Sequence, residues 1–124
     1  MSDESVPRQL DPLDAVRARI VAFRDEREWM QFHNPKNLAA SIVIEAGELL
    51  ELFQWTNMEE SERLGRDKRQ QISDEIADVA VYLIELADNL GIDLIAAIHQ
   101  KMDANALKYP VDKARGRNTK YTEL

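Results

Sequence analysis

The stretch Ser41–Trp55, SIVIEAGELLELFQW, predicts an amphipathic helix that carries carboxylates on its apolar side. With about 100° between successive residues, one arc of this helix and the turn before it gathers Leu38, Ile42, Ala46, Leu49, Leu52 and Phe53. Glu45 falls inside that arc, and Glu48 lies on its rim. A carboxylate that faces a core is costly unless a cation or several hydrogen-bond donors meet it. The stretch therefore predicts a partner for its acids.

A second acidic pair follows on the next long amphipathic stretch. The apolar positions that share a face there are Ile72, Ile76, Val79, Leu83, Leu86 and Leu90. Glu75 lies at the edge of this face, and Asp78 lies one turn further along. Acids at spacing i, i+3 are neighbours on a helix surface. If the two helices pack antiparallel, up to four carboxylates converge.

Composition places the chain among helical proteins. It has 124 residues with 44% hydrophobic and 31% charged residues, and only four Gly and four Pro. These proportions favour a single all-α domain. There is no cysteine, which excludes disulfides and thiolate metal sites. We expect a four-to-five-helix bundle protomer.

Charge and hydropathy limit the partners of the chain. A net charge of −7 argues against broad contact with nucleic acid. No apolar run approaches the roughly 20 residues of a membrane span, and the first residues lack the apolar core of a signal peptide. We therefore expect a cytoplasmic protein that contacts neither nucleic acid nor membrane. A small anionic substrate stays possible, because divalent cations invert the charge of an acidic pocket.

Capping and breaking residues set the expected bounds of the elements. We expect a helical domain over residues 11–110, between a disordered leader (1–10) and a basic tail (111–124). The first expected helix runs from Pro12, capped by Asp11, to about Glu28, and an aromatic connection, Trp29–Lys36, follows it. The second runs from Pro35 or Asn37 to Gln54 and leads into a connection with a short helical turn, Thr56–Asp67. The third runs from about Arg66 to Asn89 and is ended by Gly91, and the fourth is Leu94–Lys108, capped by Asp93 and stopped by Pro110.

Both long helices also carry apolar residues away from the expected core. Ile44 and Trp55 fall together on the far side of one helix, and Val81 and Ile84 do so on the other. Exposed apolar faces indicate a second burial surface. A homo-oligomer is the simplest explanation.

The two acidic pairs, ExxE and ExxD, predict a metal site. Mg²⁺ and Mn²⁺ prefer oxygen ligands and bind a few carboxylates together with phosphate oxygens. The alternative is solvated helical charge, which many helices carry. A carboxylate-bridged di-iron bundle needs Glu-x-x-His pairs. Neither His33 nor His99 follows a Glu by three positions, so that interpretation is disfavoured.

Two further sets of residues are candidates for contact with a nucleotide. Aromatic rings stack on nucleobases, and His hydrogen-bonds their edges; the candidates are Trp29, Phe32, His33, Trp55 and Tyr82. Each is also a normal core or interface residue. Lys101 and Asn105 interrupt the apolar face of the last long helix. Lys101 either forms a structural ion pair with the carboxylates or contacts a phosphate.

Beyond the two acidic pairs, five segments of the chain carry a wider resemblance: WMQFHNPKNL, EAGELLELFQW, DEIADVAVYL, KMDANALKYP and KYTEL. Together they resemble one known family, the all-α nucleoside triphosphate pyrophosphohydrolases of the MazG and dUTPase-like superfamily, in particular their dCTP pyrophosphatase branch. The resemblance spans nearly everything from Leu13 onward. It implies a MazG-like helical protomer that assembles as a homotetramer, a dimer of dimers, and hydrolyses a nucleoside triphosphate to the monophosphate and pyrophosphate.

The resemblance also implies residue roles. Four acids match the Mg²⁺ ligands: Glu45, Glu48, Glu75 and Asp78. Four residues match positions around the deoxynucleotide: Trp29, His33, Trp55 and Tyr82. Lys101 and Asn105 match polar groups near its phosphates. From general acid–base chemistry, we expect one of Glu45 and Glu48 to orient or deprotonate the attacking water.

One departure from the family concerns the base. The first helix of mammalian members contributes a His to the nucleotide site, and Ile20 stands at that position here. The expected substrate is dCTP or a 5-modified dCTP, converted to dNMP and pyrophosphate in cleansing of the nucleotide pool. A non-catalytic helical oligomerisation module is the alternative.

Overall fold

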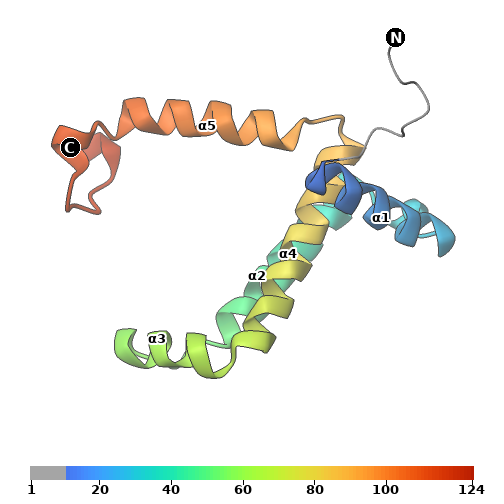
Figure 1. Ribbon diagram of the computed structural model, residues 1–124, viewed down its shortest axis with the longest axis horizontal. Helices are drawn as coiled ribbons and strands as arrows, with labels where there is room; N and C mark the ends of the chain where they lie inside the picture. The colour runs from blue at the N-terminus through green and yellow to red at the C-terminus, as the bar shows by residue number, and fades with distance from the viewer. Residues whose placement is uncertain (1–10) are drawn as a thin grey trace, which may run out of the picture. The chain divides into compact units, whose positions relative to one another are not determined.

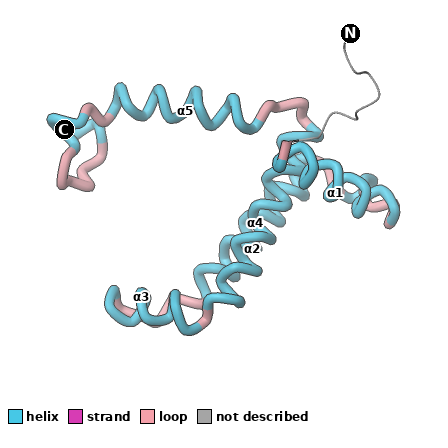
Figure 2. Tube along the Cα trace, in the orientation of Figure 1, coloured by secondary structure: helices cyan, strands magenta, loops and turns pink. Residues whose placement is uncertain are grey.

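The computed structural model describes residues 11–124, which form helices joined by turns and contain no strand (Figures 1 and 2). This confirms the predicted all-α class. The predicted leader, residues 1–10, lies outside the described residues. The chain divides into two compact units, one that ends at Leu90 and one that begins at Gly91. Each unit is described by itself, and the single domain expected over residues 11–110 stays a prediction.

The first unit is built around two long helices that lie side by side and antiparallel, α2 (Pro35–Glu51) and α4 (Arg69–Asn89) (Figure 1). Helices α1 (Pro12–Glu26) and α3 (Met58–Asp67) each pack against α4. A short 3₁₀ helix, η1 (Met30–Phe32), connects α1 to α2. The antiparallel pair is the arrangement that brings the two acidic pairs together.

Side-chain caps fix where these helices begin. Asp11 accepts a hydrogen bond from the Asp14 amide at 2.9 Å, as its place before Pro12 predicts. Asn34 accepts one from the amide of Asn37, also at 2.9 Å. Asn34 is therefore the cap of α2, and Pro35 is its first residue.

Three helix bounds differ from the expected ones. Helix α1 ends at Glu26, because the chain turns at Glu28, whose φ is +55°. Helix α2 ends at Glu51 rather than Gln54, and α4 begins at Arg69 rather than about Arg66. The chain between α2 and α4 is more helical than expected, because α3 is a ten-residue helix capped by Asn57 rather than a single turn.

The first unit buries few apolar side chains completely. Leu38 is 1% exposed and Ala87 8%, whereas Trp55 and Met58 are almost entirely exposed. The predicted apolar arc of α2 is mostly half-buried against α4. Apolar surface of this extent is typical of a chain that packs against another one. Among residues 11–124, no helix combines the length and apolar character that a membrane span requires.

The second unit consists of α5 (Leu94–Lys108) and the segment that follows it. Helix α5 has the predicted bounds, and Asp93 caps it by accepting from the Ala96 amide at 3.0 Å. The predicted tail forms two short helices, α6 (Val111–Ala114) and η2 (Tyr121–Glu123). The rings of Tyr109 and Tyr121 meet edge to face at 5.9 Å. The end of the chain is therefore more ordered than expected, because it packs against the end of α5.

Candidate active site

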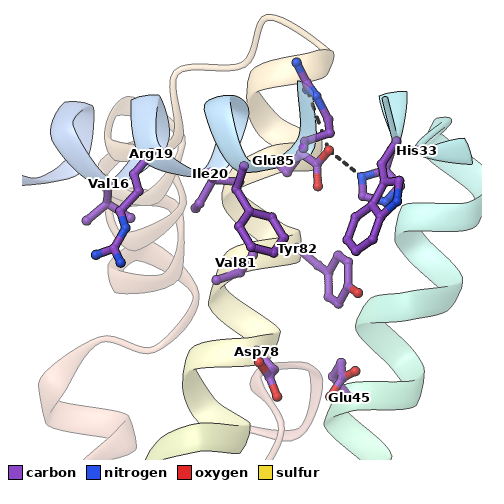
Figure 3. A pocket seen from close by; sticks show the side chains of 12 residues that line it. Val16, Arg19, Ile20, His33, Glu45, Asp78, Val81, Tyr82 and Glu85 are labelled. Atoms are coloured by element: carbon purple, nitrogen blue, oxygen red, sulfur yellow. Dashed lines mark hydrogen bonds and ion pairs between the residues drawn. The ribbon is translucent and has the colours of Figure 1, made fainter. Parts of the chain in front are cut away.

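Carboxylates from α2 and α4 converge as the sequence predicts. Glu45, Glu48 and Glu75 each offer an oxygen, and these oxygens lie within 4.8 Å of one another. Asp78, one turn along α4 from Glu75, faces Glu45 (Figure 3). The spacing i, i+3 on each helix and the antiparallel packing together produce this cluster.

Two oxygens of the cluster are left without a partner. Glu45 Oε2 and Glu75 Oε2 are buried, and neither has a hydrogen-bond partner among the described residues. An unpaired buried carboxylate oxygen is destabilising, so native proteins rarely keep one without a ligand. An all-carboxylate set of this kind fits a hard divalent cation such as Mg²⁺.

Proximity and burial change the protonation of these acids. The pKa of Glu45 is raised from 4.5 to about 7 by burial first, and then by the hydrogen bond and charge of Glu48 and the charge of Asp78. Burial, followed by the charge of Glu48, also raises the pKa of Glu75. A bound cation would favour the ionised form of both carboxylates and so oppose these shifts.

A cleft of about 420 Å³ opens beside the cluster, among α1, α2 and α4. Glu45 and Asp78 lie at one end of the cleft and His33 and Glu85 at the other, with Tyr82 between them (Figure 3). The α1 side of the lining is Val16, Arg19, Ile20, Phe23 and Arg24. Ile20 thus lines the cleft, at the position where the family resemblance implies a His. Mostly apolar walls with a few polar groups are typical of small-molecule sites.

Aromatic rings form a connected wall of the cleft. Trp29 lies 6.1 Å from His33 and 5.7 Å from Phe23, and His33 lies 6.4 Å from Tyr82, measured between ring centroids. Burial raises the pKa of Tyr82, and the charges of Glu45 and Asp78 add to this shift, so its hydroxyl stays protonated. Such a wall suits the flat face of a nucleobase.

A buried polar network holds the end of the cleft away from the carboxylate cluster. Glu85, which is 2% exposed, accepts a hydrogen bond from His33 Nδ1 at 2.6 Å. Arg24 lies 3.6 Å from the same oxygen and donates to Asn89 Oδ1 at 2.8 Å. Asn89 in turn donates to the carbonyl of His33 at 3.3 Å.

Sequence reasoning missed this network. One signal was available, because Glu85 lies seven residues after Asp78 and so falls on the same face of α4.

Three predicted binding residues are not brought to the cleft within the first unit. Trp55 follows α2, is 88% exposed and does not line the cleft. Lys101 and Asn105 lie on α5, in the second unit. The roles of these three residues stay predictions. Phe32 is 58% exposed and does not line the cleft, and His99 is exposed, as expected of a surface residue.

Comparisons with known proteins agree with this fold. The model of the MazG-like family matches residues 40–124. The dCTP pyrophosphatase 1 proteins of Homo sapiens and Rattus norvegicus are each 42% identical to this chain over 114 residues, which cover 90% of this chain and 67% of the relative. A pyrophosphatase from Archaeoglobus fulgidus, known from a crystal structure, superposes with a TM-score of 0.80 at 40% identity, over 85% of this chain and 98% of that one.

The chain belongs to the MazG-like family. This confirms the predicted family and the all-α fold expected from it. The family match includes both acidic pairs and the segment 111–124.

Proposed function

We propose that this protein is a Mg²⁺-dependent pyrophosphohydrolase that converts a deoxynucleoside triphosphate to the monophosphate and pyrophosphate. The observation that carries the proposal is the cleft itself. Its aromatic wall leads to a carboxylate cluster in which two buried oxygens have no partner among the described residues. Such a cleft suits a base at one end and a cation-bound phosphate chain at the other.

The relatives support the class of enzyme and the substrate. The curated relatives are named dCTP pyrophosphatase, and the matching solved structure is named a pyrophosphatase. These names agree with the predicted nucleoside triphosphate hydrolase. We extend the proposal to dCTP or a 5-modified dCTP as the preferred substrate, in cleansing of the cytoplasmic nucleotide pool.

Glu45, Glu48, Glu75 and Asp78 would hold the cation. When bound, Mg²⁺ (or Mn²⁺ in its place) neutralises charge on phosphate oxygens and lowers the pKa of nearby water. Glu45 or Glu48 orients the attacking water and accepts its proton. The oxygen of this water forms a bond to phosphorus as the bridging P–O bond between the α- and β-phosphates breaks, so that the monophosphate and pyrophosphate are released. The mostly apolar walls of the cleft strengthen these charge interactions by excluding bulk water.

Contacts to the rest of the nucleotide follow from the same cleft. Trp29 and Tyr82 offer faces for stacking on the base, and His33 offers a polar edge. We assign Lys101 and Asn105 to the phosphates and Trp55 to the nucleotide as parts of the proposal. The support for these three assignments is the family resemblance of their segments.

We also propose that the protein works as a homotetramer, a dimer of dimers. Ile44 is 61% exposed and Trp55 88%, on the sides of α2 and its following turn that the sequence marks as a second apolar face. On α4 the predicted second face is not free in the same way, because Val81, 37% exposed, lines the cleft and Ile84 is half-buried, so Ile44 and Trp55 support the proposal. Covering these side chains would stabilise an assembly by about 25 cal/mol for each Å² of apolar surface buried.

The test is turnover of dCTP with Mg²⁺ by the wild type, Glu45→Gln and Asp78→Asn. Both variants are expected to lose activity by about a hundredfold or more, because each removes a charge that holds the cation. Glu51→Gln on α2 and Asp74→Asn on α4 are matched controls, since both acids are exposed and neither lines the cleft. Near wild-type rates in both cluster variants would remove the mechanism.

The alternative, a non-catalytic oligomerisation module, has one observation in its favour, the exposed apolar surface of α2. It gives no reason for two unpaired buried carboxylate oxygens. It also predicts that wild-type protein does not hydrolyse any nucleoside triphosphate.

A further inference from the structure

The end of the cleft opposite the carboxylate cluster is held by a buried carboxylate that the proposed hydrolysis does not use. The side chain of Glu85 is 3% exposed, and its Oε1 meets His33 Nδ1 at 2.6 Å. It lies on the same face of α4 as Asp78 and Tyr82 and lines the same cleft. Burying a charged carboxylate costs free energy, so a functional role would explain why the protein has one at this place.

Arg24 supplies the opposite charge. Its side chain is 10% exposed, and Nη1 lies 3.6 Å from Glu85 Oε1. Arg24 Nε also pairs with Asp25 at 2.8 Å, whose side chain is 53% exposed, whereas that of Glu85 is buried. Glu85 therefore has a permanent cation beside it in addition to the N–H of His33. Arg24 also donates to Asn89, which donates to the backbone carbonyl of His33. The ring and the backbone of His33 are thus both fixed by α4.

This arrangement determines what His33 presents to the cleft. An ionised carboxylate only accepts hydrogen bonds, so Nδ1 of His33 carries a hydrogen. The two nitrogens of an imidazole point in diverging directions, so Nε2 faces away from Glu85. No described residue forms a hydrogen bond with Nε2. In a neutral ring Nε2 is then an acceptor and seeks an N–H donor on the ligand.

We infer that Glu85 is a positioning residue that fixes His33 as a hydrogen-bond acceptor, and that His33 thereby selects bases with an exocyclic amino group. Cytosine offers an amino donor where uracil and thymine offer a carbonyl acceptor. A carbonyl at that place meets an acceptor and leaves both groups unpaired. The inference rests on the proposed function, and it adds to that function His33 as the residue that recognises the base.

The tautomer of His33 tests the inference without any turnover. The chain has two histidines, so long-range ¹H–¹⁵N correlation spectra of the imidazoles are simple, and a His99→Gln variant assigns them. In mildly alkaline buffer, we expect wild-type His33 to be the Nδ1–H tautomer. A ring that carries its proton on Nε2, or on both nitrogens, overturns the inference even if the protein is an active hydrolase.

Substrate selection is the second readout. Wild-type kcat/KM is expected to favour dCTP over dUTP by about tenfold or more, the effect of one well-placed hydrogen bond. Glu85→Gln is expected to bring the ratio close to unity, because an amide can donate to Nδ1 and leave the proton on Nε2. The change should appear mainly in KM, since Glu85 lies away from the carboxylate cluster. An unchanged ratio in folded Glu85→Gln overturns the inference.

Asp88→Asn is the matched control. Like Glu85, Asp88 lies on α4 and faces an arginine of α1, Arg17, at 3.8 Å, but it does not line the cleft. This variant should keep the tautomer and the substrate ratio of the wild type. If wild-type protein does not hydrolyse either nucleotide, the proposed function fails, and the tautomer still decides the role of Glu85.

Discussion

At the scale of single residues, Glu45 is the acid whose pKa burial and neighbouring charges raise most among the described residues. Three neighbouring acids and its own burial raise its pKa to about 7. Its Oε2 has no hydrogen-bond partner among the described residues, so either a proton or a cation would compensate for the buried charge at that oxygen. Glu45 is therefore poised to exchange a proton for a cation near neutral pH.

This exchange predicts a pH dependence of stability. The folded pKa of Glu45, about 7, is above its ordinary value of 4.5, so the stabilisation from its proton is complete below about 4.5 and is lost as pH rises through about 7. We expect the melting temperature of metal-free protein to fall across this window. Mg²⁺ should restore stability mainly at the upper end, where the carboxylate is free to bind.

Glu45→Gln is the control for this prediction, measured by thermal melts with and without Mg²⁺. The variant should show a flatter pH profile and little response to the metal. A profile with the same slope as the wild type would assign the pH dependence to other groups.

The residues of the site differ in how far sequence could predict them. Glu45, Glu48, Glu75 and Asp78 were predictable, because the spacing i, i+3 on two apolar faces is a local pattern. The role of Glu85 was not, because its partner His33 is 52 residues away along the chain. Only the tertiary packing that places His33 and α1 against α4 brings such partners together.

At the scale of elements, α1 is held on α4 by ion pairs of very different burial. The Arg24–Glu85 pair has side chains that are 10% and 3% exposed, and Arg17–Asp88 has side chains that are 47% and 32% exposed. Exposed pairs contribute little to stability, whereas breaking a buried pair leaves an uncompensated charge.

Arg24→Met is therefore expected to lower the free energy of unfolding by about 3 kcal/mol. Arg17→Met should change it by less than about 1 kcal/mol. Urea unfolding followed by circular dichroism measures both. The double variant Arg24→Met, Glu85→Met should recover part of the loss, and a loss in Arg24→Met no larger than in Arg17→Met would contradict a structural role for the pair.

Helix α3, which the sequence predicts only as a short helical turn, shows where apolar periodicity fails to predict the length of a helix. Helix α3, MEESERLGRD, has two apolar residues, Met58 and Leu64, and a glycine in its interior, so its apolar stripe is weak. Its start signal was present, since Asn57 precedes it and accepts from the Glu60 amide at 2.8 Å. The cap and its acidic first turn favour helix where the apolar pattern does not.

Asn57→Ala is expected to lower the free energy of unfolding by about 1 kcal/mol, the usual cost of losing a cap. Asn57→Ser keeps a capping oxygen and should stay close to the wild type. Urea unfolding of the two variants makes the comparison. Equal losses in both would show that the cap does not hold α3.

At the scale of the whole molecule, the exposed apolar side chains were the part of the prediction that a single chain cannot test. Sequence marked Ile44 and Trp55 as a second apolar face, and both are largely exposed in this chain. The bounds of α5 followed from its cap and from Pro110, whereas the antiparallel packing of α2 and α4 entered the sequence prediction only as a condition. The order of residues 111–124 did not, because it depends on Tyr121 packing against Tyr109.

Trp55→Glu is expected to shift the protein from a tetramer toward smaller species, since it places a charge on the apolar face. Sedimentation velocity or light scattering at several concentrations measures the mass. Gln54→Glu adds the same charge at the neighbouring position and should leave the assembly intact. A wild-type protein that is monomeric at all concentrations would contradict the proposed assembly.

The central claim is that carboxylates of α2 and α4 bind a divalent cation together with a nucleoside triphosphate. Its most direct test is a thermal melt with Mg²⁺ and a non-hydrolysable dCTP analogue, in the wild type and in Glu45→Gln. A ligand at about a hundred times its Kd stabilises the native state by about 2.7 kcal/mol. We predict a rise in melting temperature of several degrees in the wild type that needs both ligands and is absent in Glu45→Gln. No rise in the wild type, or an equal rise in both proteins, would contradict the account.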